Sequence, residues 1–561
     1  MKNDLKPKIL KTMKTYSKEQ FVKDLIAGII VAIVALPLSI ALAIASGVNP
    51  ERGLYTAIIA GFFISFLGGS RVQIGGPTAA FVVIIYGIVA NPEYGVEGLI
   101  VATIMAGIML VLMGVLRLGS MIKYIPYTIT TGFTAGIAVS IFAGQIKDFL
   151  GLEMGAVPSE FVEKMIAYAE NIGSINWIAL AMGVLSIVLI ALTPKITTKI
   201  PGSLVAIVVT TLIVKLADLD VSTIGSVYGE LSSKFPTPAL PKVSWKMVQS
   251  LISPAFTIAI LAAIESLLSC VVSDGMIDSK HNSNAELVAQ GVGNIFSGLF
   301  GGIPATGAIA RTAANVKNGG RTPVAGMVHA ITLLLVLLVC MPLAAMIPMT
   351  TLAAVLMVVA YNMCEYKQFI HLLKTAPKMD ITVLLTSFFL TVFFDLVVAI
   401  EIGVVLSALF FMKRMSDTAT VRSWVYASDF HDEGRETHDL RYVPENTLVF
   451  EVEGPMFFAA ADKFLDIPKI AEYRNKNVVI VRMRSVPAID ASAMRNLVKM
   501  EERLEKKGIH LILSHVLEQP MRVLKKEAGL LEKIGDDNVC AHIDIALERA
   551  ETYRNEWKKA E

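Results

Sequence analysis

The chain has 561 residues, of which 54% are hydrophobic and 17% are charged, and its formal net charge is +2. Charged residues gather at the two ends, so the composition indicates a membrane protein with many spans and a soluble tail. The near-neutral charge gives no indication of a nucleic-acid partner. Four cysteines have no paired spacing, so neither a disulfide framework nor a metal site is predicted, and no cofactor is expected.

Residues 1–23 form a lysine-rich segment ahead of the first long apolar run. Its lysines are Lys2, Lys6, Lys8, Lys11, Lys14, Lys18 and Lys23. Lys413 and Arg414 follow the last apolar run in the same way. Because lysine and arginine concentrate in cytoplasmic loops, both chain ends are expected in the cytoplasm, with the protein in the cell (plasma or inner) membrane. This orientation requires an even number of spans.

Apolar runs predict fourteen membrane segments between residues 24 and 415. They lie near 24–47, 53–68, 77–90, 98–115, 125–145, 176–192, 201–217, 253–273, 286–300, 310–318, 323–346, 350–363, 380–395 and 397–412. A polar link with three prolines separates the seventh from the eighth, which divides the segments into seven plus seven. The third and tenth are interrupted and end in short helices, and their equal place in the two halves predicts an inverted repeat.

The two interrupted segments share one pattern, in which paired glycines precede an extended run and then a short helix. In one, Gly301-Gly302 leads to an extended run over 305–310 and a helix over 311–318. In the other, Gly68-Gly69 leads through Gly75-Gly76-Pro77 to a helix that starts near Thr78. Non-helical backbone at membrane depth is tolerated only where protein or a water-filled cavity satisfies its polar groups, so both segments are expected to line a site. Two coincidental Gly-rich loops are the alternative.

Arg311 is a lone positive charge in the second interrupted segment. The N-terminus of a short helix beside it would offer N–H donors and a positive dipole end, so the expected ligand is an anion. Thr78 and Thr312 adjoin this position, and their alternative role is to cap or pack the helices. Arg311 could instead be the structural partner of Glu265.

Glu265 is the only charged residue between Pro254 and Val272. A lone carboxylate at membrane depth costs at least about 2.5 kcal/mol, so it should face the interior and be protonated, paired or bound to a cation. Ser269 lies on the same helix face and adds an oxygen ligand. The pattern therefore favours a coupling site for H⁺ or Na⁺, although Glu265 could also be a neutral side chain bonded to broken-helix backbone.

No Ser/His/Asp set, paired catalytic carboxylates or nucleotide-binding loop appears, so no enzyme activity is predicted and transport must draw on an ion gradient.

The tail alternates strands at 447–453, 478–483 and 509–514 with helices at 491–507, 519–526 and 541–554, which predicts a small α/β domain. We expect an N-terminal segment at 1–23, a transporter domain at 24–415, a linker at 416–442 and this α/β domain at 443–557.

These features resemble the SulP family of anion transporters, the bacterial relatives of the SLC26 carriers, over nearly the whole chain. The resemblance rests on Leu36-Pro37-Leu38-Ser39-Ile40-Ala41, Gly75-Gly76-Pro77-Thr78-Ala79, Ala263-Ile264-Glu265-Ser266-Leu267-Leu268-Ser269, residues 280–287, Gly291-Val292-Gly293-Asn294 and the stretch through Arg311. It implies fourteen spans in a seven-plus-seven inverted repeat with core and gate domains. It also implies an elevator-like motion, with substrate held between the third and tenth half-helices.

The resemblance assigns roles to individual residues. The expected substrate-binding residues are Gly76, Thr78, Ala79, Ala310, Arg311 and Thr312. The expected coupling-ion residues are Glu265, Ser269 and Thr306. The tail resembles a STAS domain, which implies a homodimer or a cytoplasmic protein partner. Ser492 matches a phosphorylatable position of related domains, but Ala493 replaces the glycine typical there, and a helix N-cap is the alternative role of Ser492.

The sequence thus predicts a secondary active transporter in contact with membrane lipid, moving sulfate with a proton. Alternative cargoes are a C4-dicarboxylate or bicarbonate, with Na⁺ as the alternative coupling ion. More distant alternatives are a nucleobase permease of the same fold, an anion channel, and a sensor that signals through the STAS domain.

Overall fold

The computed structural model describes residues 5–560, apart from 121–125, 156, 159, 197–200, 240, 242, 395, 424–441, 459, 474–475 and 527–529. The chain divides into two compact units, Met1–Val405 and Leu406–Glu561. Most of the linker expected at 416–442 lies outside the described residues.

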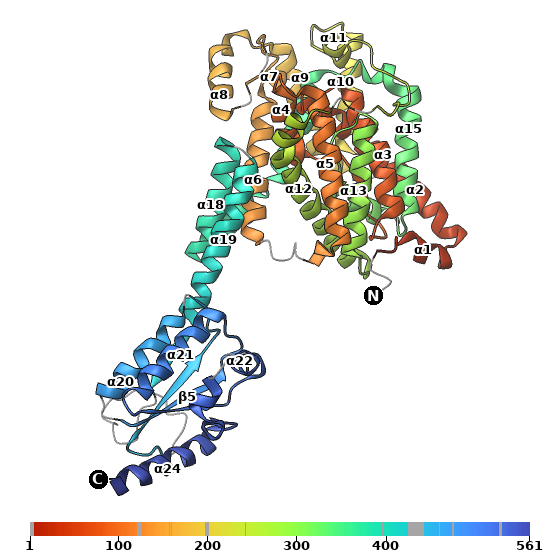
Figure 1. The fold of residues 1–561 in the computed structure, drawn as a ribbon. Coiled ribbons are helices and arrows are strands. Elements are labelled where there is room, and N and C mark those ends of the chain that lie inside the picture. The colour runs from red at the N-terminus through yellow and green to blue at the C-terminus, as the bar shows by residue number, and fades with distance from the viewer. Residues whose placement is uncertain are drawn as a thin grey trace. The chain divides into compact units, whose positions relative to one another are not determined.

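The first unit is helical, and a helix occupies each of the fourteen expected membrane segments (Figure 1). These helices are α2 (Lys18–Ala45), α3 (Pro50–Leu67), α4 (Val82–Ala90), α5 (Gly95–Val115), α6 (Tyr127–Gly144), α9 (Trp177–Ile196), α10 (Gly202–Leu216), α12 (Trp245–Ile277), α13 (Ser283–Leu299), α14 (Ile309–Lys317), α15 (Val324–Ala344), α16 (Met349–Met363), α18 (Lys378–Phe393) and α19 (Leu396–Thr418). Shorter helices connect them: α1 (Ile9–Thr12), α7 (Ile146–Leu150), α8 (Phe161–Glu170), α11 (Ile224–Tyr228) and α17 (Tyr366–Thr375). In the described part of the chain, seven helical stretches are long and apolar enough to cross a membrane unaided.

Polar side chains set where the long helices begin. The Ser17 hydroxyl accepts a hydrogen bond from the Gln20 N–H at the start of α2, and Ser244 caps α12 in the same way. At the start of α13, the Asn282 side chain accepts from the Ala285 N–H. Each cap satisfies an N–H group that has no partner within its helix.

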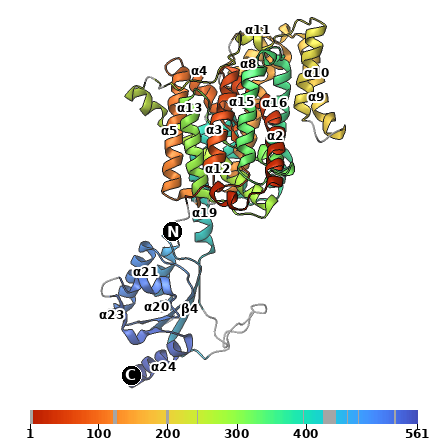
Figure 2. The ribbon, with the colours of Figure 1, turned by 90° about the vertical axis from the view of Figure 1, so that its right-hand side faces the viewer.

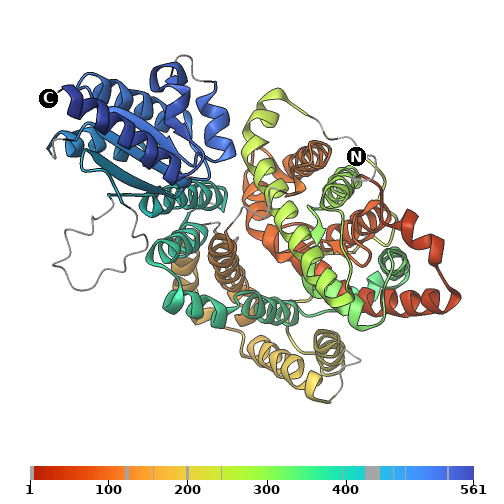
Figure 3. The same ribbon diagram turned by 90° about the horizontal axis from the view of Figure 1, so that it is seen from below.

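The membrane helices form two packed groups. In the first, α2 to α5 pack with α12 to α15, and Figure 2 shows α2, α3, α5, α13 and α15 standing together. In the second, α6, α9 and α10 pack with α16, while α18 packs on α6; Figure 3 shows α9 beside α10 at the edge of the unit. The first group combines expected segments one to four with eight to eleven, and the second draws on the later segments of each half. This correspondence confirms the predicted fold of repeated halves with core and gate domains.

Glycines bring α5 and α13 unusually close. A Cβ added to Gly291 would lie 2.5 Å from the Gly107 carbonyl oxygen and 2.6 Å from the Val111 backbone nitrogen. A Cβ on Gly107 would lie 2.7 Å from the Gly291 carbonyl oxygen. Small residues allow helix backbones to approach in this way inside a membrane, where close packing drives helix association. Gly291 is part of the Gly291-Val292-Gly293-Asn294 motif.

We predict that Gly291→Ala destabilises the folded protein by about 1–3 kcal/mol, because the new methyl group meets backbone that must shift. Gly144→Ala is the matched control, since a Cβ there meets no described atom within 4 Å. Thermal unfolding in detergent should show a lower Tm for Gly291→Ala and no loss for Gly144→Ala. Equal Tm values would contradict the close approach.

The second unit contains a five-stranded sheet of order β3-β4-β5-β6-β7, in which β3 is antiparallel to β4 and the other neighbours are parallel. The strands are β3 (Thr420–Ser423), β4 (Thr447–Glu453), β5 (Val478–Ser485), β6 (His510–Ser514) and β7 (Val539–Cys540). Alternate residues of β5 face two different cores: Val479 and Val481 pack with α21 (Ala491–Glu505), and Val478 and Ile480 with α24 (Ile543–Ala560). Figure 1 shows these helices on opposite faces of the sheet. Short helices α20 (Ile467–Tyr473), α22 (Glu518–Leu524) and α23 (Leu530–Ile534) complete the unit.

Two expectations for this unit are corrected. The strand β3 lies inside the range expected to be linker, because its residues pair with Phe450–Glu453 of β4. The helix α21 is capped by Asp490, whose carboxylate accepts from the Ala493 N–H at 2.8 Å. Ser492 is therefore not the N-cap, and it lies exposed in the first turn.

Candidate functional site

The two interrupted segments pair with each other in the centre of the first group. Strand β1 (Gly75–Gly76) lies antiparallel to β2 (Thr306–Gly307), with Gly75 opposite Gly307. A short helix follows each strand: the 3₁₀ turn η2 (Ala79–Phe81) leading into α4, and α14. The helix α14 begins at Ile309, two residues earlier than predicted, so Arg311 lies inside its first turn.

Two glycines make the pairing possible. Gly76 has φ +152°, and a Cβ there would lie 2.5 Å from the Arg311 Nη1 atom. A Cβ on Gly307 would overlap the carboxamide of Gln73. Glycine is needed at both positions because the chain approaches a polar side chain more closely than any Cβ permits.

Side chains from α3 and α13 satisfy the backbone of the second segment. The Asn294 carboxamide donates to the Ala305 carbonyl and accepts from the Ala305 N–H, both at 2.8 Å. The Thr56 hydroxyl oxygen accepts from the Ile303 N–H at 2.7 Å. These bonds replace the helical ladder that the segment lacks.

The first segment is held by α13 and α14. The Glu286 carboxylate accepts from the N–H groups of Gly69 and Ser70 at 2.9 and 3.0 Å. The Ile74 N–H donates to the Thr312 hydroxyl at 3.0 Å. In the same way, the Asn315 carboxamide donates to the Val72 carbonyl at 2.9 Å. Thr312 lies within α14, whose N-cap position is Ala308, so its expected alternative role as a cap is wrong.

Gln73 is a central polar residue that the sequence did not single out. Its carboxamide donates to the Ser266 carbonyl at 3.1 Å and accepts from the Ser269 hydroxyl at 2.8 Å. Ser269 also lies 3.3 Å from the Thr312 hydroxyl. Gln73 thus ties the first interrupted segment to α12, and no local pattern marks it because its partners lie 193 and 196 residues away.

Arg311 is buried, with 5% of its surface exposed. Its Nη2 atom donates to the Pro77 carbonyl, while its Nη1 atom has no hydrogen-bond partner among the described residues. No salt bridge joins Arg311 to Glu265 in the described part of the chain. A direct structural ion pair, the alternative raised by the sequence, is therefore not formed.

Glu265 is linked through Thr78 to the residues expected to bind the anion. The Thr78 hydroxyl donates to the Glu265 Oε2 atom at 2.9 Å. Thr78 occupies the N-cap position of η2, but its side chain makes no capping bond there. The expected substrate-binding and coupling groups are therefore in direct contact at this pair.

The other expected residues take different places. Ser269 and Thr306 do not contact Glu265 through hydrogen bonds, because their hydroxyls donate to Gln73 and to the Ala262 carbonyl. Ala79 is 8% exposed and opens η2. Ala310 is exposed in the first turn of α14.

We predict that Thr312→Val destabilises the protein by about 1–3 kcal/mol, because valine leaves the buried Ile74 N–H without an acceptor. Thr312→Ser restores the hydroxyl and should recover most of the loss. Thermal unfolding of both variants in detergent measures the effect. A valine variant as stable as the wild type would show that this bond does not hold the strands.

The fold and the paired half-helices define a multi-pass membrane transporter with a C-terminal α/β domain. The chain belongs to the sulfate permease family, whose match covers residues 21–387, and residues 441–546 match the STAS domain. The SulP resemblance inferred from the sequence is thus confirmed.

Two relatives are similar in sequence over most of the chain. YvdB of Bacillus subtilis, named as a candidate sulfate transporter, is 41% identical over 535 residues, which cover 95% of this chain and 98% of YvdB. The bicarbonate transporter BicA of Picosynechococcus is 33% identical over 451 residues, or 78% of this chain and 79% of BicA.

Solved structures agree in fold. The transmembrane domain of a cyanobacterial BicA aligns with a TM-score of 0.62 and 30% identity, covering 70% of this chain and 98% of that domain. SLC26A9 aligns with a TM-score of 0.84 over 98% of this chain and 93% of its own, at 19% identity. The second similarity concerns the fold alone.

Proposed function

We propose that the protein is a secondary active anion transporter that moves sulfate together with a proton. The observation that carries the proposal is the buried Arg311 guanidinium, whose Nη1 atom has no partner among the described residues. A buried charge without a partner is costly, and a bound anion would both neutralise it and accept its free N–H groups. In this proposal Gly76, Thr78, Ala79, Ala310, Arg311 and Thr312 surround the anion.

The local charge suits a divalent anion. The N-terminal ends of two short helices contribute roughly +0.5 each, and Arg311 adds one full charge, which sums to about +2. Ionised Glu265 would subtract from this sum through its contact with Thr78. A proton on Glu265 therefore favours anion binding, and by thermodynamic linkage a bound anion favours the proton.

The two packed helix groups support alternating access of the elevator type. Both half-helices, Gln73 and Glu265 belong to the first group, so the anion and coupling sites would travel as one body. The second group, with α6, α9, α10, α16 and α18, would serve as the gate against which this body moves.

Bicarbonate is the second candidate cargo. BicA, a bicarbonate transporter, is 33% identical to this chain, and the BicA transmembrane domain shares its fold. A C4-dicarboxylate and Na⁺ coupling complete the alternatives that the same site can serve. Two further alternatives have the same fold but a mechanism other than coupled transport: an anion channel, and a sensor that signals through the STAS domain.

Uptake of labelled sulfate into proteoliposomes under an inward proton gradient tests the proposal, with bicarbonate and succinate as competitors. Saturable, gradient-driven uptake supports the proton-coupled sulfate carrier. Conduction without saturation would favour a channel, and the absence of any flux would favour a sensor. Uptake of labelled bicarbonate or succinate, in vesicles that take up no sulfate, would reassign the cargo, and a Na⁺ gradient would then be tested in place of the proton gradient.

We predict that Arg311→Gln raises the Kd for the transported anion by about 10–100-fold, since a hydrogen bond between charged groups contributes roughly 1.5–3 kcal/mol. Arg117→Gln removes an exposed arginine at the end of α5 and should leave the Kd unchanged. Isothermal titration or substrate-dependent thermal stabilisation measures both. Unaltered affinity in a folded Arg311→Gln protein would refute the assignment of the anion site.

We predict that Glu265→Gln abolishes proton-driven accumulation but preserves anion exchange down a concentration gradient. The amide keeps an acceptor for the Thr78 hydroxyl while losing the titratable proton. Uptake with and without a pH gradient, compared with counterflow in the same vesicles, separates coupling from damage to the site. Accumulation that still follows the proton gradient would assign coupling to another residue.

The cellular arrangement completes the proposal. We place both termini in the cytoplasm and the protein in the cell (plasma or inner) membrane, since lysines crowd residues 1–23. The STAS domain would mediate a homodimer or bind a cytoplasmic protein. Exposed Ser492 in the first turn of α21 is open to a kinase there.

A further inference from the structure

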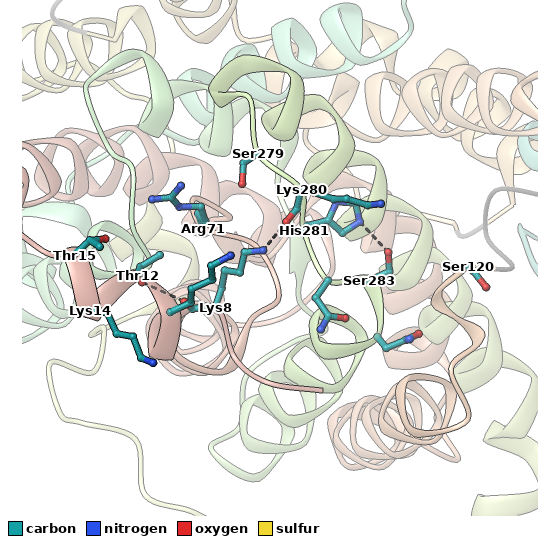
Figure 4. Close-up of a pocket in the computed structure, with 13 residues that line it drawn as sticks. Lys8, Thr12, Lys14, Thr15, Arg71, Ser120, Ser279, Lys280, His281 and Ser283 are labelled. Carbon is teal, nitrogen blue, oxygen red and sulfur yellow. Dashed lines mark hydrogen bonds between the residues drawn. The ribbon is translucent and has the colours of Figure 1, made fainter. Parts of the chain in front are cut away.

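A cavity that shares no lining residue with the proposed anion site opens where the N-terminal segment meets the loop between α12 and α13 (Figure 4). Its volume is about 760 Å³, within the range typical of small-molecule sites. Five of its lining residues are cationic: Lys8, Lys11, Lys14, Arg71 and Lys280. They come from three stretches far apart in the sequence, so it is the fold that brings these positive side chains together.

Acidic groups do not neutralise these cations. Among the described residues, none of the five forms a salt bridge with a carboxylate. The Asp274 carboxylate, which lies near Lys8, already binds the His281 ring and backbone N–H at 2.7 Å. Partial burial, followed by the charge of Lys11, lowers the pKa of the Lys8 ammonium below its ordinary value. The cavity therefore holds excess positive charge that a bound anion would stabilise.

One donor group of a lining residue also lacks a partner. The Nε atom of Arg71 is buried and has no hydrogen-bond partner in the described structure. Figure 4 shows the Arg71 and Lys8 side chains on one side of the cavity, with Ser279 close to them. A planar guanidinium with several ammonium groups matches the oxygens of a phosphate, which accept many charge-assisted hydrogen bonds.

The cavity lies at the ends of membrane helices. The first long helix, α2, starts at Lys18, shortly after the lining residue Lys14, and α12 ends at Ile277, two residues before Ser279. A lipid headgroup at the membrane surface can reach such a position, and basic pockets between membrane helices bind anionic headgroups.

We infer that this cavity binds a phosphate group, presented either by an anionic lipid headgroup or by a soluble phosphate compound. The site is distinct from the transport site, and this inference does not rest on the identity of the transported anion.

Backbone contacts connect the cavity to the transport site. The Lys8 N–H donates to the Gly68 carbonyl at 2.9 Å, and the Asn282 N–H donates to the Gly69 carbonyl at 2.9 Å. Arg71 is two residues from Gln73, which bonds to α12. A phosphate bound by Lys8, Arg71 and Lys280 would therefore clamp the N-terminal segment and the α12–α13 loop onto the interrupted segment. Occupancy stabilises the junction that supports β1.

The test measures binding to the full-length protein in detergent by thermal stabilisation and native mass spectrometry. Three probes are used: phosphatidylglycerol, phosphatidylcholine and inorganic pyrophosphate. The pocket variant is Lys11→Gln with Arg71→Gln and Lys280→Gln. The matched control is Lys195→Gln with Lys234→Gln and Lys367→Gln, three exposed lysines outside the cavity.

We predict that the pocket variant binds the anionic probe roughly tenfold or more weakly, since each basic residue near a membrane surface contributes to headgroup binding, while the control binds as the wild type does. Stabilisation by phosphatidylglycerol over phosphatidylcholine identifies a lipid ligand, and stabilisation by pyrophosphate alone identifies a soluble one. Equal binding of both anionic probes to the pocket variant, the control and the wild type overturns the inference.

A second variant tests the site in case the triple variant does not fold. Lys11→Gln with Lys14→Gln changes two exposed side chains, so a monodisperse protein is expected even if the Arg71 variant aggregates. Its binding should fall in the same direction, and unchanged binding would count against the site. Because binding is read directly, failure here is distinguishable from failure of sulfate transport.

Discussion

The structure depends on satisfying irregular backbone inside a membrane. Residues 69–76 and 303–308 leave helical geometry, and each free N–H or C=O there would cost several kcal/mol in a lipid environment. Asn294, Glu286 and Thr312 supply the missing partners from neighbouring helices. The two short strands also bond to each other. This network holds the ends of two half-helices together at one point.

That arrangement determines which groups remain available for function. Gln73 and Thr306 donate their hydrogen bonds to backbone carbonyls of α12, and Ser269 donates to the Gln73 carboxamide. Arg311 keeps one nitrogen without a described partner, and Glu265 makes its hydrogen bond to Thr78. The residues that hold the backbone and the residues proposed to bind the anion and the coupling ion are thus different members of the same cluster. A change in the charge of Glu265 is felt at Thr78 directly, without a relay through the scaffold.

Much of this organisation could be predicted from the sequence, because hydrophobic runs and unusual charges are local signals. The fourteen segments, the two interruptions and the isolated Arg311 and Glu265 all stand out in single windows of sequence. Three of the five STAS strands were equally visible from their apolar runs. The strand β3, whose four residues pair with a strand more than twenty residues later, and the two-residue strand β7 were not predicted.

The roles of hydrogen-bonding side chains could not be predicted in the same way. Gln73 in the first interrupted segment, and Asn294 and Glu286 in α13, act on backbone that the sequence does not place beside them, and no local pattern marks such a side chain. Ser269 shares a helix face with Glu265, yet its hydroxyl turns to Gln73 because that carboxamide offers an acceptor at 2.8 Å. Helix geometry gives the face of a side chain but not its partner.

The long sequence separation between partners has a consequence for biosynthesis. The N–H groups of Gly69 and Ser70 donate to the Glu286 carboxylate, more than 200 residues later in the chain. The Ile74 N–H donates to the Thr312 hydroxyl, 238 residues later. At about 5–20 residues per second, ribosomal synthesis takes roughly 10–50 s to supply those partners. During that interval the first interrupted segment cannot rest in lipid in its final form. Until the second half of the transporter emerges, the segment must either stay at the translocation channel or the membrane interface, or satisfy its backbone groups in another conformation such as a helix.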